Sequence, residues 1–493
     1  MLSGVVLALV GCVEYSLPPI ASDANHASAT PEFTGAGIAI PLLANNVPAH
    51  PFLAAPGRNG MHADSYASHF HPYPGPMKSQ PVVKSAKVGK LFGGECATVV
   101  FDRQGRLYTF CSTLVDMSLY ALDAETLHVL AKKTLPLRDS NKSLNIKAIM
   151  GDTSGGAYFH LDQDDRPIIA TADKKIQIFE LQGTGNNLEW VVVKQYDILP
   201  ALSTSSRVTD AIPDWQGNLW FITREGIVGA IDKTTGAIRT TALSGEEIQN
   251  SLAVAADGVY IVSNFAMYRF ELDAAGVPTP VWRKEYDRGS VAKPGQLDQG
   301  SGTTPVLLDY NGHRWLAIGD NADSQINAVV FNRDNGDVIC KVPLFEPGQS
   351  ATDNAFIGYR NSIVVENNYG YQGPLADNWT TPGVSRIDID PDGSPGQPCT
   401  TRWTSPQASQ TTVHKLSANG LVYLYTREPI PGKPATAQAY YLTTISFETG
   451  ELVRKVLTGT GANYNNNYAP ITIGPDGKAY VGVLAGIISV GDR

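Results

Sequence analysis

The chain repeats one pattern eight times, and this repetition restricts its fold more than any other feature does. In each copy an apolar run leads into a turn rich in Asp, Asn and Gly, and an aromatic-rich run follows the turn. A period of about 41 to 61 residues is wide enough for four short strands. The turns lie near Gly105, Gly156, Gly217, Gly258, Gly312, Ser362, Gly420 and Gly477.

A second pattern follows most of these turns and completes the repeating unit. It consists of a strand, an Asp/Asn/Gly turn and an outer strand, as in "YALDAETLHVLAKKT" and "VVFNRDNGDVICKVPLF". Each unit therefore predicts four antiparallel strands with the fourth one outermost, which is the plan of a propeller blade. We predict an all-β fold, an eight-bladed β-propeller of four-stranded blades over residues 81–493, with seven blades as the main alternative.

The last repeat ends at "GIISVGDR", after its third strand. A ring with one incomplete blade would leave a sheet edge unpaired, and such edges invite aggregation. The segment "PVVKSAKVG" precedes the first repeat and has the composition of a strand. We expect this segment to supply the missing outer strand and close the ring.

The first 12 residues, "MLSGVVLALVGC", form a short apolar run that ends in Cys12. This run resembles a bacterial lipobox, which implies a lipidated Cys12 and an exported protein of the cell envelope. An ordinary signal peptide and a secreted protein are the alternative, and no basic residue precedes the apolar run. Residues 13–80 lack periodicity and are interpreted as a tether and an irregular N-terminal arm. We expect membrane contact only through the lipid anchor.

Four cysteines remain when Cys12 is set aside, an even number for an exported chain. Cys96 and Cys111 fall opposite one another if their hairpin turns about residues 103–104, so a cross-strand disulfide is predicted. Cys340 and Cys399 occupy equivalent places in consecutive repeats and are predicted to pair between neighbouring blades. Two free buried thiols are the alternative for this second pair.

The turns "ALDAETL", "AIDKTTGAI" and "SFETGEL" are similar to an element of the quinoprotein alcohol dehydrogenase-like, or pyrroloquinoline quinone repeat, propellers. The resemblance spans roughly residues 90–493 and implies a propeller that binds pyrroloquinoline quinone. Two departures argue against this cofactor. The segment "AIDKTTGAIRTTA" lacks the Trp that follows the Gly in the family, and the chain has no adjacent cysteines.

Polar residues gather where the inner strands of such a ring would begin and where the second strands would end. In a propeller these positions face one opening of the axial channel. The opening therefore predicts a polar cavity that binds a small molecule, and a plain hydrated channel is the alternative. The candidate ligand-binding residues are Glu95, Asp210, Asn250, Thr304, Asn354, Asn367, Tyr369, Asn467 and Tyr468.

Four of the axial positions carry oxygen ligands of the kind that calcium prefers. They are Glu366, Asn250, Asn354 and Asn467. This set resembles the axial metal site of gluconolactonase- and paraoxonase-type hydrolases, which implies a calcium ion that polarises a carbonyl group. His414 or Asp353 would then be the general base.

Three classes of function follow from these features. The first is an enzyme at the axial mouth, a calcium-assisted hydrolase or lyase. The second is a quinone-dependent dehydrogenase, and the third is a scaffold of the cell envelope that binds protein partners. A net charge of −9 argues against nucleic acid. Three further histidines, at positions 62, 69 and 71, match no metal signature, and we interpret their segment as packed on the surface.

Overall fold

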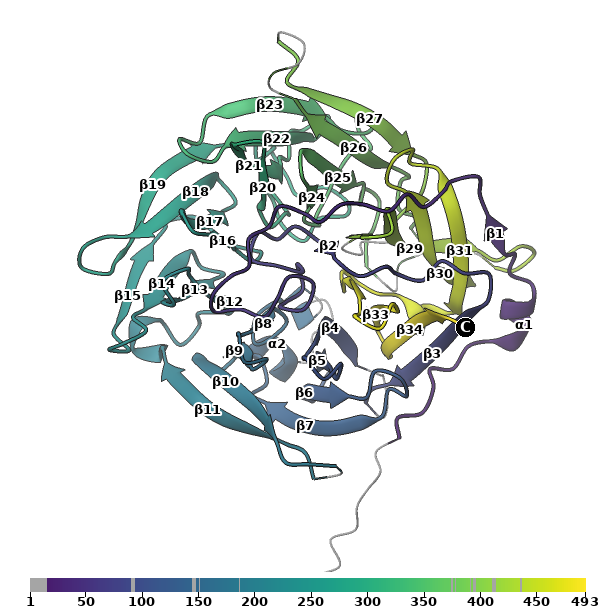
Figure 1. Cartoon of the computed structure of the whole chain (residues 1–493), viewed down its shortest axis with the longest axis horizontal. Coiled ribbons are helices and arrows are strands. Elements are labelled where there is room, and N and C mark those ends of the chain that lie inside the picture. The colour runs from purple at the N-terminus through teal and green to yellow at the C-terminus, as the bar shows by residue number, and fades with distance from the viewer. Residues whose placement is uncertain are drawn as a thin grey trace, which may run out of the picture.

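The computed structural model describes residues 16–89, 94–143, 148–149, 151–185, 187–373, 376, 378–390, 392, 396–409, 414–434 and 437–493. Eight sheets, each with four strands of a blade, surround one axis in this part of the chain (Figure 1). The prediction of eight blades is confirmed, and the alternative of seven is wrong. Cys12 and its proposed lipid anchor lie outside the described residues.

The first four blades follow one another along the chain, and in each the strand order runs from the axis outward. Blade 1 contains β4 (Glu95–Phe101), β5 (Leu107–Ser112), β6 (Met117–Leu122) and β7 (Val129–Leu135). Blade 2 contains β8 (Phe159–Leu161), β9 (Pro167–Thr171), β10 (Lys175–Gln182) and β11 (Glu189–Asp197). Blade 3 contains β12 (Val208–Pro213), β13 (Leu219–Thr223), β14 (Ile227–Ile231) and β15 (Ile238–Ala242). Blade 4 contains β16 (Ala253–Ala255), β17 (Gly258–Val262), β18 (Ala266–Leu272) and β19 (Pro278–Glu285).

The next three blades repeat this plan. Blade 5 contains β20 (Val306–Tyr310), β21 (His313–Gly319), β22 (Asn327–Asn332) and β23 (Val338–Pro343). Blade 6 contains β24 (Ile357–Tyr359), β25 (Ser362–Glu366), β26 (Val384–Ile389) and β27 (Cys399–Ser405). Blade 7 contains β28 (Lys415–Ser417), β29 (Leu421–Pro429), β30 (Gln438–Ser446) and β31 (Leu452–Thr460), and β1 (Phe33–Thr34) and β2 (Phe70–His71) extend its two edges.

Blade 8 closes the ring with strands from both ends of the chain. It contains β32 (Ile471–Ile473), β33 (Ala479–Val483), β34 (Gly486–Asp492) and, outermost, β3 (Pro81–Lys87). β3 pairs antiparallel with β34 over its full length. The predicted closure by "PVVKSAKVG" is therefore confirmed.

In the described part of the chain, helix is limited to short stretches of the arm and of the connections. The α-helices are α1 (Ala24–Ser28) and α2 (Asp139–Lys142), and the 3₁₀ turns are η1 (Leu199–Ala201) and η2 (Ala462–Tyr464). No helix in the described segments is long and apolar enough to cross a membrane.

Both predicted disulfides are present. Cys96 and Cys111 lie opposite one another on β4 and β5. Cys340 on β23 and Cys399 on β27 join the outer strands of blades 5 and 6. The second bridge thus links two neighbouring blades at the rim of the ring, as their equivalent positions in the repeats indicate.

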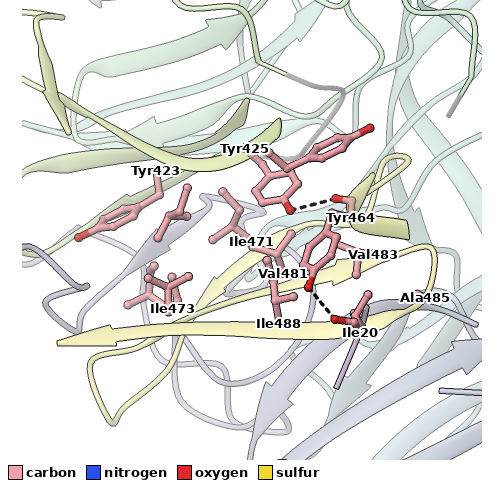
Figure 2. Close-up of a cluster of buried hydrophobic side chains, with 14 of the residues drawn as sticks. Ile20, Tyr423, Tyr425, Tyr464, Ile471, Ile473, Val481, Val483, Ala485 and Ile488 are labelled. Atoms are coloured by element: carbon pink, nitrogen blue, oxygen red, sulfur yellow. Dashed lines mark hydrogen bonds between the residues drawn. The ribbon is translucent and has the colours of Figure 1, made fainter. Parts of the chain in front are cut away.

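Apolar side chains between the blades form the core. The interface of blades 7 and 8 shows the arrangement: Tyr425 of β29 lies beside Ile471 and Val481 (Figure 2). The Tyr425 hydroxyl donates to the Tyr464 carbonyl oxygen at 2.9 Å, and the Tyr464 hydroxyl donates to the Ile20 carbonyl oxygen at 2.9 Å. Buried phenols thus keep a hydrogen-bond partner, and this offsets the cost of removing them from water.

The N-terminal arm enters the ring. In Figure 1 the purple trace of the arm crosses the centre of the propeller. Backbone amides of five inner strands donate to arm carbonyls at 2.7–3.0 Å, in blades 2, 4, 5, 6 and 7. The predicted surface packing of the three arm histidines is wrong, because His62, His69 and His71 are 4%, 0% and 1% exposed. The inner strands have backbone groups with no partner in their own sheet, and the arm backbone supplies partners for them. The periodicity of the sequence does not indicate this contact.

Candidate active site

Two adjoining cavities share lining residues at the axis of the ring. The inner one, called the chamber here, has a volume of about 120 Å³, and the outer one, the vestibule, about 1200 Å³. Ordinary ligand pockets span roughly 300–1,000 Å³. The chamber alone therefore accepts one end of a molecule, and the vestibule accepts the rest. Both cavities are lined by Arg138, Asp152, Leu297, Asn467 and Tyr468.

Seven of the residues predicted from sequence line the chamber. They come from blades far apart in the chain because the loops before the inner strands converge on the axis. These residues are Glu95, Asn250, Thr304, Asp353, Asn354, Asn467 and Tyr468.

Glu95 begins β4 and projects into the chamber from blade 1. Its Oε2 accepts a hydrogen bond from Asn467 Nδ2 at 3.2 Å. Burial raises the pKa of Glu95 to about 8, and the Asn467 hydrogen bond lowers it in part. A carboxyl group in this state holds its proton near neutral pH and can donate it.

Asp353 lies on the opposite arc of the ring, before β24 of blade 6. Its Oδ2 accepts a hydrogen bond from the Leu297 backbone amide at 3.0 Å. Burial raises the pKa of Asp353 well above its usual value, and the Leu297 bond opposes this rise. The chamber thus contains two carboxyl groups that arrive from separate blades, each held by its own amide.

Asn467 and Tyr468 lie in the connection before blade 8 and line both cavities. Both adopt positive φ, 40° and 68°, a conformation that Asn tolerates and that is strained for Tyr. Tyr371 holds them in place, since its hydroxyl donates to Asn467 Oδ1 at 3.0 Å and its ring meets the Tyr468 ring edge-on at 5.5 Å. The strain is concentrated where the chamber meets the vestibule.

Glu366 and His414 lie one layer behind the chamber and line neither cavity. Asn354 Nδ2 donates to Glu366 Oε1 at 2.6 Å, and His414 Nδ1 lies 3.4 Å from Glu366 Oε2. His414 Nε2 donates to the Val364 carbonyl oxygen at 2.9 Å. Burial raises the pKa of Glu366 to about 8 and lowers that of His414 to about 4, so both are neutral at pH 7. Of the two predicted bases, Asp353 alone faces the chamber.

Three other predicted residues have structural contacts instead of cavity positions. Asp210 accepts from His160 Nε2 at 3.0 Å and from Ser251 Oγ. Asn367 Nδ2 donates to the Gln349 carbonyl oxygen at 2.9 Å, and its Oδ1 accepts from the Tyr369 amide at 3.0 Å. Tyr369 lines neither cavity.

Arg138 is the main residue that the sequence did not reveal. Its guanidinium is buried at the junction of the two cavities, and the side chain is about 5% exposed. Among the described residues its one hydrogen bond runs from Nε to the Ser154 carbonyl oxygen, at 2.6 Å. Both Nη groups therefore remain available to a ligand. Arg138 lies in the long connection between blades 1 and 2, where no strand pattern points to the axis.

The vestibule contains five basic and three acidic side chains. Two of the basic ones are engaged, because Arg207 pairs with Glu225 and Arg224 pairs with Asp298. The other three, Arg138, Lys174 and Lys293, form no ion pair among the described residues and place positive charge around the vestibule. Positive charge at this opening attracts anions although the protein as a whole is acidic. The lining residues are Arg138, Lys174, Arg207, Arg224 and Lys293, with Asp139, Asp152 and Asp298.

The lining does not fit a quinone held as the resemblance implies. Among the described residues no cysteine lines the chamber or the vestibule, and the Cys96–Cys111 bridge lies in an apolar cluster between blades. We therefore derive no step through a quinone.

The donor set fits calcium in part. Three predicted ligands, Asn250, Asn354 and Asn467, line the chamber with amide oxygens, whereas Glu366 lies behind it. The described segments contain no group of three or more His, Cys, Asp or Glu side chains placed to bind one metal ion. Calcium would thus depend on amide oxygens and on few carboxylates, and it stays a prediction.

Comparison with known proteins places the fold. No family model matches the chain. An uncharacterized protein of Archaeoglobus fulgidus is 24% identical over 342 residues, 62% of this chain and 65% of that protein, so less than two thirds of the relative is matched. A quinohemoprotein alcohol dehydrogenase of Pseudomonas putida HK5 superposes with a TM-score of 0.54 at 11% identity, covering 88% of this chain and 80% of that one. A europium-containing methanol dehydrogenase gives 0.47 at 12% identity, covering 86% and 88%. The quinoprotein-like propeller fold indicated by the repeat turns is confirmed; at these identities the likeness concerns the fold.

Proposed function

We propose that this propeller is an acid–base enzyme, a hydrolase or lyase, that acts on a small carboxylate-bearing molecule in its axial cavity. One observation carries the proposal: the buried Arg138 guanidinium, whose one hydrogen bond among the described residues uses Nε alone, lines the same chamber as the carboxyl groups of Glu95 and Asp353. A hydrated channel without a ligand site would not require a buried arginine beside two carboxyl groups, each with its own amide donor.

Arg138 is the anchor for the substrate. A guanidinium presents paired N–H donors that match a carboxylate, and such charge-assisted bonds are stronger than neutral ones. The vestibule cations attract the anion, and Arg138 fixes its carboxylate at the junction of the two cavities. The reacting end then lies in the chamber.

Glu95 and Asp353 carry out the proton transfers. Asp353 is the general base in its ionised form, and the Leu297 amide that donates to its Oδ2 lowers its pKa against the larger rise caused by burial. Glu95 is the general acid, held by the Asn467 amide group. Hydrolysis would use Asp353 to activate water and Glu95 to protonate the leaving oxygen; elimination would use the same pair on a C–H bond and a leaving hydroxyl. Calcium on the chamber amides would supply a Lewis acid when bound.

Export and lipid anchoring through Cys12 belong to this proposal. The two disulfides support an oxidising compartment, because such bridges are rare in the cytosol. The proposed ligand is a small molecule, with membrane contact through the lipid anchor alone. A scaffold that binds protein partners is the alternative.

The test is a panel of small carboxylates that carry a lactone, an ester or a 3-hydroxyl group. Acid release in a pH-stat reports hydrolysis, and ultraviolet absorbance of a conjugated product reports elimination. We expect turnover by the wild type, a 10²–10⁴-fold loss in Glu95→Gln, and a roughly 10- to 150-fold loss of kcat/KM in Arg138→Gln, from about 1.5–3 kcal/mol for a charge-assisted bond.

The control is Glu246→Gln, a glutamate outside both cavities that binds Tyr268 and Arg283. It should keep the wild-type rate. Equal rates in Glu95→Gln and the wild type would refute the acid–base role. A panel with no turnover and no effect on melting temperature would favour the scaffold.

A further inference from the structure

A continuous chain of hydrogen-bonded side chains leads from the chamber into the arm. His62 lines the chamber, and its Nε2 lies 3.3 Å from Thr304 Oγ1, which also lines it. His62 Nδ1 lies 2.7 Å from His69 Nε2. His69 Nδ1 lies 3.3 Å from Lys415 Nζ. The chain therefore joins four side chains without a gap and ends at a buried amine.

The arm backbone fixes this geometry. The arm folds back between the two histidines, so that the His69 amide donates to the His62 carbonyl oxygen at 3.0 Å. His69 adopts a φ of 58°, an unusual value for a residue other than Gly. Lys415 Nζ donates to the Met61 carbonyl oxygen, which ties the lysine of blade 7 to the arm. A strained backbone at His69 and the Lys415 hydrogen bond to Met61 thus hold His62, His69 and Lys415 together.

Burial favours the uncharged forms of His62, His69 and Lys415. His62, His69 and Lys415 are fully enclosed, and burial lowers the pKa of both imidazoles well below the usual value and that of Lys415 to about 7. The titratable groups that face them are Asp64 and His71 of the arm, His160 of β8 and His414 before β28. Asp64 raises the pKa of Lys415, and His160 and His414 lower the pKa values of the imidazoles.

We propose that His62 is a further catalytic residue of the chamber and that His69 and Lys415 relay its proton to and from the interior. This inference rests on the proposed function. It assigns a role to the arm, which would then be a part of the site rather than a tether.

The relay has two states that differ by one proton. When Lys415 is a neutral amine, it accepts from His69 Nδ1–H, His69 Nε2 accepts from His62 Nδ1–H, and His62 Nε2 is free to take a proton from a bound molecule. Uptake of that proton at Nε2 moves one proton across each bond in turn and leaves Lys415 as an ammonium. Both imidazoles end neutral with exchanged tautomers, so one proton enters and none is lost. The reverse sequence makes His62 Nε2–H a donor.

This mechanism predicts a tautomer change that nuclear magnetic resonance can follow without any ligand. We would label histidine with ¹⁵N and lysine with ¹³Cε and titrate the full chain. In the wild type the ¹⁵N shifts of His62 and His69 should exchange between Nδ1–H and Nε2–H values with one midpoint, the midpoint of Lys415 near pH 7. Lys415→Met should abolish this step completely, and His69→Gln should uncouple His62 from Lys415.

The matched control is His71→Gln, a buried arm histidine outside the relay. It should leave the linked step in place at the same midpoint. Circular dichroism of each variant separates loss of linkage from loss of fold. The relay is overturned if His62 shifts stay flat through the Lys415 midpoint, or if the step survives Lys415→Met.

The panel of carboxylates supplies a second readout. Lys415→Met should lower turnover 10- to 100-fold and remove the limb near pH 7 from the pH–rate profile, with KM unchanged because Arg138 still holds the carboxylate. Turnover without a linked step refutes the relay and leaves the proposed function standing. A linked step without turnover on any compound supports the relay and refutes the proposed function.

Discussion

Glu95 and Glu366 share a raised pKa, but Glu95 lines the chamber and Glu366 lies behind its wall. Glu366 is fully buried and Glu95 is partly buried, and burial raises the pKa of each to about 8. Glu95 lines the chamber and shares one hydrogen bond with an amide. Glu366 lines neither cavity and lies between Asn354 and His414. Burial sets the pKa, and access to the cavity decides whether the proton can be used.

The comparison shows why a perturbed carboxyl group is not by itself a catalytic one. Structural and catalytic groups both lose water on folding, and both then hold their protons. Glu366 orients Asn354, whose side chain faces the chamber. Its role is that of a positioning residue behind the wall.

The largest expected difference between the two glutamates is catalytic. Glu95→Gln removes the proposed general acid and should lower turnover of the carboxylate panel 10²–10⁴-fold. Glu366→Gln retains a hydrogen-bonding side chain behind the wall and should lower turnover at most about tenfold, through Asn354. Steady-state kinetics on both variants check this. Equal losses would place Glu366 in the chemistry.

The second difference concerns stability and has the opposite order. Glu366→Ala removes the carboxyl oxygen that accepts from the buried Asn354 Nδ2 at 2.6 Å, at roughly 1–3 kcal/mol. Glu95→Ala leaves Asn467 Nδ2 beside a cavity where water can replace the carboxyl group, so we expect a loss below about 1 kcal/mol. Denaturant unfolding measures both free energies. A larger loss in Glu95→Ala would contradict the assignment.

In pH dependence of stability the two residues should behave alike. Each has a native pKa of about 8, above the ordinary value of 4.5, so the native state binds more protons between these limits. Each therefore favours folding at low pH, and that contribution is lost as the pH rises from 4.5 through 8, on the order of 1 kcal/mol per pH unit. Glu95→Gln and Glu366→Gln should flatten this fall by similar amounts. Melting temperatures from pH 5 to 9 provide the measurement.

The smallest expected effect isolates the partner of Glu95. Asn467 donates to Glu95 Oε2 and lowers its pKa against the dominant effect of burial. Asn467→Ala should therefore move the Glu95 midpoint upward, by less than about one pH unit. Carboxyl infrared difference spectra follow the midpoint, and Asn354→Ala is the corresponding change beside Glu366. An unchanged midpoint would mean that burial alone sets the pKa of Glu95.

Much of the fold was predictable because it depends on local, repeated signals. Turns near Gly105 and Gly477 mark hairpins, and strand patterning fixes the blades between them. The register of Cys96 with Cys111 also followed from one hairpin turn. These features require only short-range pairing, which residue order determines.

The site was predictable in part. Glu95, Asp353 and Asn467 could be placed at the axis by counting back from each turn, since every blade begins at the same end of the channel. The same count also selected Asp210, and the ends of the second strands selected Glu366; both side chains lie outside the two cavities. Counting gives the height of a residue along the axis, but the direction of a loop side chain depends on its neighbours.

The sequence by itself determined an eight-bladed ring, its closure by β3 and the pairing of its cysteines, because repeats, hairpins and strand edges follow from residue order. Only the tertiary structure decided that Arg138 and Glu95 line the same chamber and that His62 of the arm faces it. Those contacts join segments that share no strand pairing in the sequence pattern. They arise because the inner strands leave unpaired backbone groups and space on the axis, and the arm fills both.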